Sequence, residues 1–397
     1  MINAQVILKK DKEKPFKNRH PWVFSGAINR VEGKPENGDV VDVWNNRARF
    51  VARGIYNDKS QIRVRLLTWN ANDQINIDFW RRRLRRAIAG RQALIMSPQT
   101  DAYRLVHSEA DGMPGLIVDQ YGPWLVVQFL SLAVERYRTD IVDVLVDLLS
   151  PQGVYERSDV ESRAQEGLVP VAGPVWGELP PDLVEINENG LTFLVDIKSG
   201  HKTGFYLDQR ENRQKCAPYL YGKEVLNAFA YTGAFSVYAA RAQAKQIINV
   251  DSSEPALQLA ERNMRRNGLG DYDVTYSVAD VFDVMRVYEA NKWRFGAVIL
   301  DPPKFAHNKH QIENASRGYK DINMLGMRIT KPGGVLMTFS CSGSIDSSLF
   351  QKILFGAAID ARRTVQIIER FSQGADHPVL LTHPESEYLT GFACRVW

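Results

Sequence analysis

One cysteine of this chain stands where a strand is expected to stop. The apolar run Leu336–Phe339 ends in Ser-Cys-Ser-Gly, so Cys341 follows the predicted strand at once. A structural thiol belongs inside a strand, whereas the carboxyl ends of strands are the edge at which α/β enzymes bind ligands. Cys341 is therefore a candidate nucleophile. The other two cysteines, Cys216 and Cys394, are interpreted as structural.

Three carboxylates also stand at the ends of predicted strands. From about residue 186 onward, strands and helices alternate regularly, which indicates an α/β fold with a doubly wound parallel sheet. Asp251, Asp280 and Asp301 each close one of the strand-like runs, which cover 224–229, 246–251, 274–280, 297–301 and 334–340. Since a buried unpaired carboxylate is costly, packing does not explain this row of acids. The row predicts a ligand site along one edge of the sheet.

The loop after the first of these strands indicates the class of cofactor. "NAFAYTGAF" (227–235) lacks the G-x-G-x-x-G spacing that cradles a diphosphate, which disfavours NAD. Asp251 lies 18 residues after Gly233, where a carboxylate suits ribose hydroxyls, and Asp280 suits an adenine amino group. A nucleoside cofactor without a diphosphate fits, and S-adenosylmethionine is the expected one. The binding residues predicted at these strand ends are Phe229, Tyr231, Gly233, Asp251, Ser252 and Asp280.

A thiol beside a carboxylate suits methylation at C5 of a pyrimidine. Attack of a thiolate on C6 moves electron density to C5, which can then accept a methyl group. For cytosine, Asp301 as an acid near N3 would stabilise the adduct. Uracil serves the same chemistry, so the residues leave the base open. An amino-methylating enzyme is a further alternative. In such enzymes Asp-Pro-Pro is followed by an aromatic residue, whereas "DPPKF" has Lys304 at that position, which disfavours this alternative.

The first 90 residues are strongly basic. They hold 19 Lys and Arg against 9 Asp and Glu, whereas the whole chain carries a net charge of only +4. Such a distribution indicates a polyanionic partner, with nucleic acid as the first choice. Arg81, Arg82, Arg85 and Arg86 crowd one face of a helix that begins near Asp78, either as a solvated face or as a ridge that contacts phosphates.

The remaining organisation is read from short runs. Strand-like stretches at 39–46, 47–57 and 61–69 predict a small β-domain, and the proline-rich stretch 170–181 is interpreted as a linker. We expect three domains, 1–72, 73–185 and 186–397. Neither a signal peptide nor a membrane span is expected, and three widely spaced cysteines indicate a reducing, cytoplasmic location. No paired C-x-x-C or H-x-x-x-H predicts a zinc site, so no metal is expected.

These motifs together resemble the bacterial ribosomal RNA large subunit methyltransferase I family over essentially the whole length. The resemblance is carried by "RHPWVFSGAI" (19–28), "HKTGFYLDQREN" (201–212), "NAFAYTGAF", "DPPKF", "RGYKDINML" (317–325) and "FSCSG" (339–343). It implies an N-terminal PUA domain, a middle α+β domain and a C-terminal Rossmann-like methyltransferase. It also implies S-adenosylmethionine as cofactor and methylation of a cytosine of 23S rRNA to 5-methylcytosine.

By this resemblance Cys341 is the nucleophile and Asp301 its motif partner. Similarity to related pyrimidine methyltransferases also suggests that Gln209 faces the cofactor or the base, whereas Asp208 alone would be read as a helix cap. Another class of RNA cytosine methyltransferases carries a second cysteine in the Pro-Pro loop, which helps release the product. "DPPKF" has none, so a different base must drive elimination. Glu387 is read either as that base or as a solvated surface acid. An RNA-binding assembly factor with an idle centre is the alternative from another class. The nucleotide position and the oligomeric state, a homodimer included, stay open.

Overall fold

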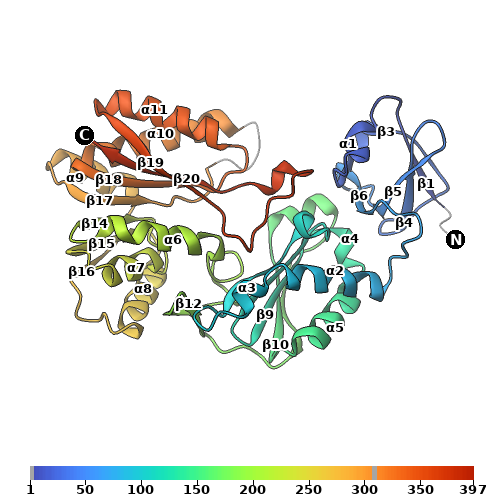
Figure 1. Cartoon of the computed structure of the whole chain (residues 1–397), viewed down its shortest axis with the longest axis horizontal. Helices are drawn as coiled ribbons and strands as arrows, with labels where there is room; N and C mark the ends of the chain where they lie inside the picture. Colours follow the sequence, from blue (N-terminus) through green and yellow to red (C-terminus); the bar gives the residue numbers. More distant parts are fainter. Residues whose placement is uncertain (1–3, 306–310) are drawn as a thin grey trace. The chain divides into compact units, whose positions relative to one another are not determined.

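The computed structural model describes residues 4–305 and 311–397, which form two compact units (Figure 1). Of the described residues, the first unit holds those up to Ile186 together with Val195–Leu207 and Asp376–Ser386. The second unit holds Asn187–Leu194, Asp208–Ala375 and Glu387–Trp397. Within the described residues no helix has both the length and the apolar character that crossing a membrane requires.

The first unit begins with a six-stranded sheet in the order β2-β6-β5-β4-β1-β3. Alternating apolar residues, such as Val41 and Val43, point into its core. The sequence predicted the last three strands but missed the first three, which are short. The strands are β1 (Gln5–Leu8), β2 (Trp22–Phe24), β3 (Ile28–Glu32), β4 (Val40–Trp44), β5 (Phe50–Tyr56) and β6 (Ile62–Thr68), with the short helix α1 (Lys14–Lys17) between β1 and β2.

A five-stranded sheet follows in the same unit, in the order β11-β10-β9-β8-β7. Helices α2 (Ile77–Ala89) and α5 (Arg138–Leu149) pack together over it, and Trp80, Leu84 and Leu145 enter the shared core. The strands are β7 (Ala102–His107), β8 (Leu116–Tyr121), β9 (Trp124–Phe129), β10 (Gly153–Ser158) and β11 (Val171–Gly177), and the short helices are α3 (Gln92–Ile95) and α4 (Leu132–Glu135).

Strand β11 corrects the prediction of a linker at 170–181. Residues 171–177 pair antiparallel with β10, and Pro174 lies opposite Tyr155 next to a shift in register. A proline has no N–H to donate and is tolerated on an edge strand or beside a bulge. Because β11 is the edge of its sheet, the prolines mark an edge strand here and not a domain boundary.

The second unit is built on a seven-stranded sheet in the order β16-β15-β14-β17-β18-β20-β19. The first five strands of this order are parallel, and β20 runs antiparallel to both neighbours. This is the predicted doubly wound fold, completed by an antiparallel edge. The strands are β14 (Glu224–Ala228), β15 (Gln246–Asp251), β16 (Val274–Val278), β17 (Phe295–Leu300), β18 (Thr330–Ser340), β19 (Val365–Ser372) and β20 (Thr390–Val396).

Helices cover both faces of this sheet (Figure 1). One face packs against α9 (Val281–Ala290), α10 (Ile312–Ile329) and α11 (Ser347–Ala361), with Met285, Tyr319 and Phe350 in the core. The opposite face carries α6 (Arg210–Cys216), α7 (Ala234–Arg241) and α8 (Glu254–Arg266). The hairpin β12 (Val184–Glu188) and β13 (Leu191–Val195) lies where the chain passes between the two units. The chain order reverses between β14 and β17, which is where such sheets bind ligands.

Candidate catalytic and cofactor site

Cys341 directly follows the last residue of β18. Ser340 and Ser342 on either side are fully buried, whereas Cys341 is half-buried. The hydroxyl oxygens of Tyr319 and Ser342 lie 3.2 Å apart, and the Ser342 carbonyl accepts from the Ile345 amide. These contacts hold the turn that carries Cys341. The thiol therefore has the exposure and the rigid support that a nucleophile needs.

The carboxylate of Asp301 follows β17, the strand beside β18. Leu300 pairs with Thr338 in the parallel register, so the two strands end at the same edge of the sheet. Nε2 of Gln209 donates to Oδ1 of Asp301 at 3.0 Å, and Oε1 of Gln209 accepts from Nδ2 of Asn212 at 2.7 Å. Asn212 fixes the amide of Gln209 with its nitrogen toward Asp301, because the amide oxygen is already engaged. The structure thus brings Gln209 to the carboxylate.

The loop after β14 is shaped by unusual backbone angles. Phe229 and Tyr231 have φ of 60° and 47°, a region that non-glycine residues seldom adopt, and Gly233 has φ of 72°. A Cβ on Gly233 would also lie 2.6 Å from Cβ of Ala260 on α8, so only glycine fits. Phe229 is therefore not the last strand residue that the sequence predicted. Left-handed non-glycine residues often gather at ligand sites.

Asp251 closes β15 and is held by two backbone amides. Oδ2 accepts from Tyr231 N at 2.8 Å and Oδ1 from Ser253 N at 2.9 Å. Ser253, not Asp251, caps α8, because its hydroxyl accepts from Ala256 N. Asp251 stays partly exposed, and Ser252 beside it is exposed. A fixed, partly exposed carboxylate next to the strained loop fits the ribose hydroxyls of S-adenosylmethionine.

Asp280 has a structural contact of its own. It lies two residues beyond β16 and caps α9, with Oδ1 accepting from Asp283 N at 3.1 Å. Its side chain is exposed, and its role toward adenine stays a prediction. Phe282 on α9 lies edge-on to Phe229, with ring centroids 6.4 Å apart, and 6.3 Å from Phe305. These rings give the edge an apolar wall.

Sequence reasoning missed Asn212, Tyr319 and Phe282. Asn212 lies in α6 three residues after Gln209, a spacing that brings two side chains to one face of a helix. The helix rule suggested that Asp208 caps α6, but Gln209 occupies the cap position. Oδ2 of Asp208 instead accepts from the Tyr388 hydroxyl at 2.7 Å. Glu387 is exposed, and its role as the base stays a prediction.

The other two thiols are buried in the core. Cys216 and Cys394 are both 0% exposed. Burial raises the pKa of Cys394 to about 12 and the pKa of Cys216 well above its ordinary value. Both remain thiols at neutral pH, in agreement with the structural role predicted for them.

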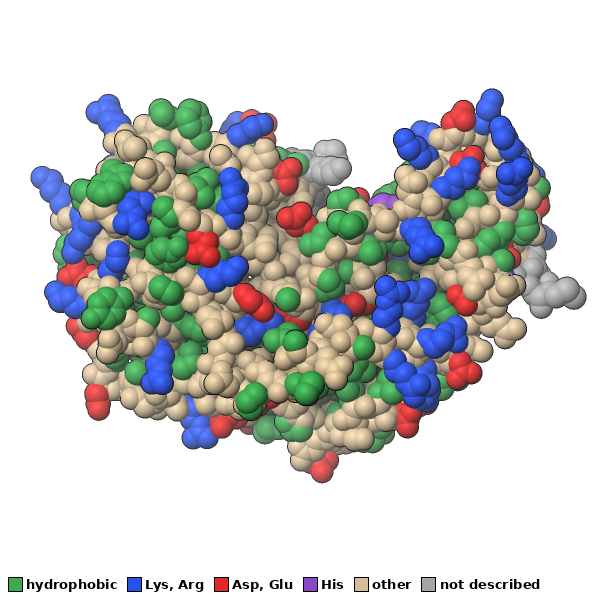
Figure 2. Space-filling view, in the orientation of Figure 1, with side chains coloured by type: hydrophobic (Ala, Val, Ile, Leu, Met, Phe, Trp, Pro, Cys, Tyr) green, Lys and Arg blue, Asp and Glu red, His purple; other side chains and the backbone are tan. Residues whose placement is uncertain are grey.

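A basic surface covers the N-terminal part of the first unit. Figure 2 shows exposed Lys and Arg side chains over this part of the molecule. On α2, Arg82, Arg85 and Arg86 are exposed, whereas Arg83 is turned inward and donates to the Leu67 carbonyl. A polyanion can reach these exposed arginines, of which Arg82 is also ion-paired with Asp73 at 3.8 Å. Arg81 of the predicted ridge is only partly exposed and pairs with Asp147.

Two protein-family models match the chain. Residues 6–69 match a PUA-like domain, and residues 171–381 match the S-adenosylmethionine-dependent methyltransferases. The second match covers more than half of the chain. The predictions of a small N-terminal β-domain of PUA type, a C-terminal methyltransferase domain and S-adenosylmethionine as cofactor are confirmed.

Similar proteins span the whole chain. SMU.776, solved in complex with SAH and proposed to be a methyltransferase, has a TM-score of 0.87 at 23% identity, with 100% of both chains covered. Trm5b from Pyrococcus abyssi has a TM-score of 0.54 at 15% identity, covering 100% of this chain and 99% of its own. At these identities the likeness shows the fold.

Two curated relatives are much closer in sequence, and both carry the name ribosomal RNA large subunit methyltransferase I. The protein of Shewanella amazonensis is 49% identical over 396 residues, and that of Erwinia tasmaniensis is 47% identical over 395 residues. Each alignment covers 100% of both chains. The chain is therefore an S-adenosylmethionine-dependent methyltransferase that belongs to the ribosomal RNA large subunit methyltransferase I family.

Proposed function

We propose that this protein methylates C5 of one cytosine in 23S rRNA through a covalent bond between Cys341 and C6 of the base. The observation that supports this most is that a half-buried cysteine follows β18 and a carboxylate follows β17, two neighbouring parallel strands that end at the same edge. Amino-group methylation needs no thiol. C5 of a pyrimidine needs one, because it is a weak nucleophile until a group adds at C6.

In this mechanism the Cys341 thiolate attacks C6, and the electron pair of the C5–C6 double bond moves into the ring toward N3. S-adenosylmethionine supplies the methyl group when bound. C5 takes that methyl, and a base then removes the C5 proton so that the C–S bond breaks and the thiolate leaves. The base is not assigned. Asp301 protonates N3 as the adduct forms and takes the proton back at elimination.

Gln209 and Asn212 serve Asp301 in this proposal. The amide of Gln209 occupies Oδ1 of Asp301, so a proton carried by the carboxyl group is directed to its second oxygen. Asn212 also donates to the Ser372 carbonyl at 2.9 Å, which anchors it to the end of β19. The role of Gln209 is thus to position the acid, which refines the prediction that it faces the cofactor or the base.

Ribosomal RNA is the proposed substrate for two reasons. The relatives that align over the full length carry that substrate in their name. The basic N-terminal surface and the exposed arginines of α2 provide the positive charge that binding to a phosphate backbone requires. Cytosine is favoured over uracil by the family resemblance alone, and the experiment below separates the two bases.

The test is covalent trapping on target rRNA fragments that carry 5-fluorocytosine. Fluorine at C5 cannot leave as a cation, so elimination stalls after methylation with sulfur still bonded to C6. We expect a complex that survives denaturing electrophoresis, that depends on S-adenosylmethionine and that maps to Cys341. Cys341→Ala should form none, while Cys216→Ala and Cys394→Ala should still form it.

Several outcomes would overturn the proposal. An adduct at Cys216 or Cys394, or full methylation by Cys341→Ala, would remove the thiol mechanism. Trapping on fluorouracil RNA alone would favour the uracil enzyme, and an amino-methylated base in rRNA would favour the third alternative. If mass spectrometry showed that the rRNA of a deletion strain lacks no methyl group, the alternative of an RNA-binding assembly factor would be favoured.

A further inference from the structure

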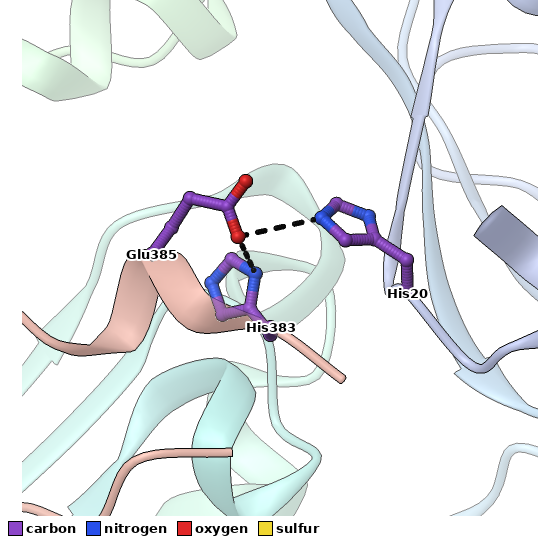
Figure 3. A group of neighbouring side chains, drawn as sticks. All are labelled: His20, His383 and Glu385. Carbon is purple, nitrogen blue, oxygen red and sulfur yellow. Dashed lines mark ion pairs between the residues drawn. The ribbon is translucent and has the colours of Figure 1, made fainter. Parts of the chain in front are cut away.

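Two histidines and a glutamate lie close together in the first unit, and none of them is among the residues of the candidate catalytic and cofactor site. His20 precedes β2, while His383 and Glu385 lie in the segment Asp376–Ser386, which belongs to the same unit (Figure 3). One nitrogen of each histidine and one carboxylate oxygen lie within 4.8 Å of one another. The three side chains come from opposite ends of the chain and point toward a common centre.

The distances in this cluster suit a metal ion. Nε2 of His20 lies 3.5 Å from Oε2 of Glu385, and Nδ1 of His383 lies 3.1 Å from the same oxygen. Tetrahedral ligands about 2.0–2.1 Å from zinc lie about 3.4 Å from one another. The two measured separations fall on either side of this value. The two imidazole nitrogens lie within 4.8 Å of each other, so the imidazoles would have to approach each other to bind one ion.

His383 supplies an independent observation. Its side chain is 3% exposed, and its buried Nδ1 lies 3.1 Å from Oε2 of Glu385 in an ion pair, without the geometry of a hydrogen bond. Its ring centroid lies 4.4 Å from that of Trp22, which holds the imidazole in place. A buried ring nitrogen that meets a carboxylate oxygen without a hydrogen bond is placed to share a metal ion with that carboxylate.

The surroundings favour a cation. Glu109 and Glu166 are buried and share the single guanidinium of Arg65, at 3.0 and 2.8 Å. Trp22 donates its indole N–H to Glu109 at 2.7 Å. Two carboxylates around one arginine leave a net negative charge beside His383, and Glu385 adds another. A divalent cation would neutralise this excess.

We propose that His20, His383 and Glu385 bind one divalent transition-metal ion of the zinc type. Two imidazole nitrogens and a carboxylate oxygen suit Zn²⁺, Co²⁺ or Ni²⁺ and disfavour Mg²⁺ and Ca²⁺. Three protein ligands leave a fourth position for water. One existing contact must change: the Trp22 amide donates to Nδ1 of His20 at 3.3 Å, and this nitrogen must carry the proton when Nε2 binds the metal. The ion would fasten the loop before β2 to the segment 376–386.

The experiment uses the untagged full-length chain, stripped with a chelator and dialysed. Titration with ZnCl₂ followed by elemental analysis should give close to one zinc per chain, and CoCl₂ should give the visible absorption of tetrahedral Co²⁺. Glu385→Gln alters an exposed side chain, so it should fold, and it should weaken Zn²⁺ binding at least tenfold. His20→Ala and His383→Ala should do the same.

His201→Ala is the matched control, because His201 is an exposed histidine of the same unit and should leave binding unchanged. Thermal unfolding of the stripped proteins separates loss of the site from loss of the fold. The wild type should rise in melting temperature on adding ZnCl₂, and Glu385→Gln should not. Zinc at well below one per chain, or equal affinity in the wild type and Glu385→Gln, would overturn the proposal.

Discussion

The candidate catalytic site and the proposed metal site bring their side chains together in different ways. At the edge of the seven-stranded sheet, each residue follows its own strand, Asp301 after β17 and Cys341 after β18. In the first unit, His20 meets His383 and Glu385, which lie near the other end of the chain. The first kind of site can be predicted from strand order, because parallel strands end together. The second kind leaves no local pattern in the sequence.

If the sheet edge carries the chemistry, Asp301→Asn should show the largest effect. The amide keeps the shape of the carboxylate but cannot carry the proton for N3, so kcat should fall about 10²–10⁴-fold. Single-turnover methylation of an rRNA fragment measures this. Calorimetry with S-adenosylmethionine should give nearly unchanged affinity. If Asp301→Asn kept the wild-type kcat, Asp301 would not be the acid that protonates N3.

The contrast between edge and core should also appear in alkylation of the three thiols. At pH 8 a buried thiol whose pKa is raised to about 12, such as Cys394, is ionised in about one molecule in ten thousand. Its alkylation should therefore be about 10³-fold slower than that of an exposed cysteine of ordinary pKa. Peptide mass spectrometry after iodoacetamide treatment should find the label on Cys341. Early label on Cys216 or Cys394 would contradict the buried core.

Substitutions of Asp251 and Asp280 distinguish a carboxylate that contacts the cofactor from one that only caps a helix. Asp251→Ala should weaken S-adenosylmethionine binding by about 1.5–3 kcal/mol, because it removes charge-assisted bonds to the ribose. Asp280→Ser keeps a capping oxygen and removes only the charge. If Asp280 accepts from the adenine amino group, calorimetry should show that Asp280→Ser also binds S-adenosylmethionine more weakly. Unchanged binding by Asp251→Ala would remove that residue from the cofactor site.

Asn212→Ala tests whether an indirect contact matters at the edge. With Asn212 gone, the Gln209 amide can turn over, and we expect kcat to fall about tenfold while cofactor affinity stays the same. The pH profile of kcat should shift because Asp301 loses a fixed donor. Gln214→Ala, on the exposed side of the same helix, is the control. A loss of stability without a change in the pH profile would assign Asn212 to structure alone.

The smallest effect is expected on the basic surface. Replacing Arg82, Arg85 and Arg86 with Gln should lower the slope of log K against log salt by about 0.7 for each phosphate of single-stranded RNA that is no longer neutralised. Filter binding of rRNA fragments at several salt concentrations measures this. Methylation at saturating RNA should be unchanged. An unaltered slope would mean that these arginines form only a solvated face.

The sequence predicted the parallel sheet and the strand ends at which Asp301 and Cys341 stand, because each depends on local pattern and on the geometry of parallel strands. It could not predict Asn212 as the support of Gln209, since that contact depends on the side-chain orientation within α6. It misread β11, because prolines break central strands but not edges. The left-handed angles of Phe229 and Tyr231 follow from tertiary contacts such as the bond between Tyr231 N and Asp251.

The return of Asp376–Ser386 to the first unit has a consequence for synthesis. Asp376 is buried, with its carbonyl accepting from Arg91 and its carboxylate from the Arg104 amide, each at 2.8 Å. Arg91 and Asp376 are 285 residues apart, so at about 5–20 residues per second Arg91 waits about 15–60 s for its partner on the ribosome. The N-terminal unit, though made first, completes its folding only when translation is nearly over.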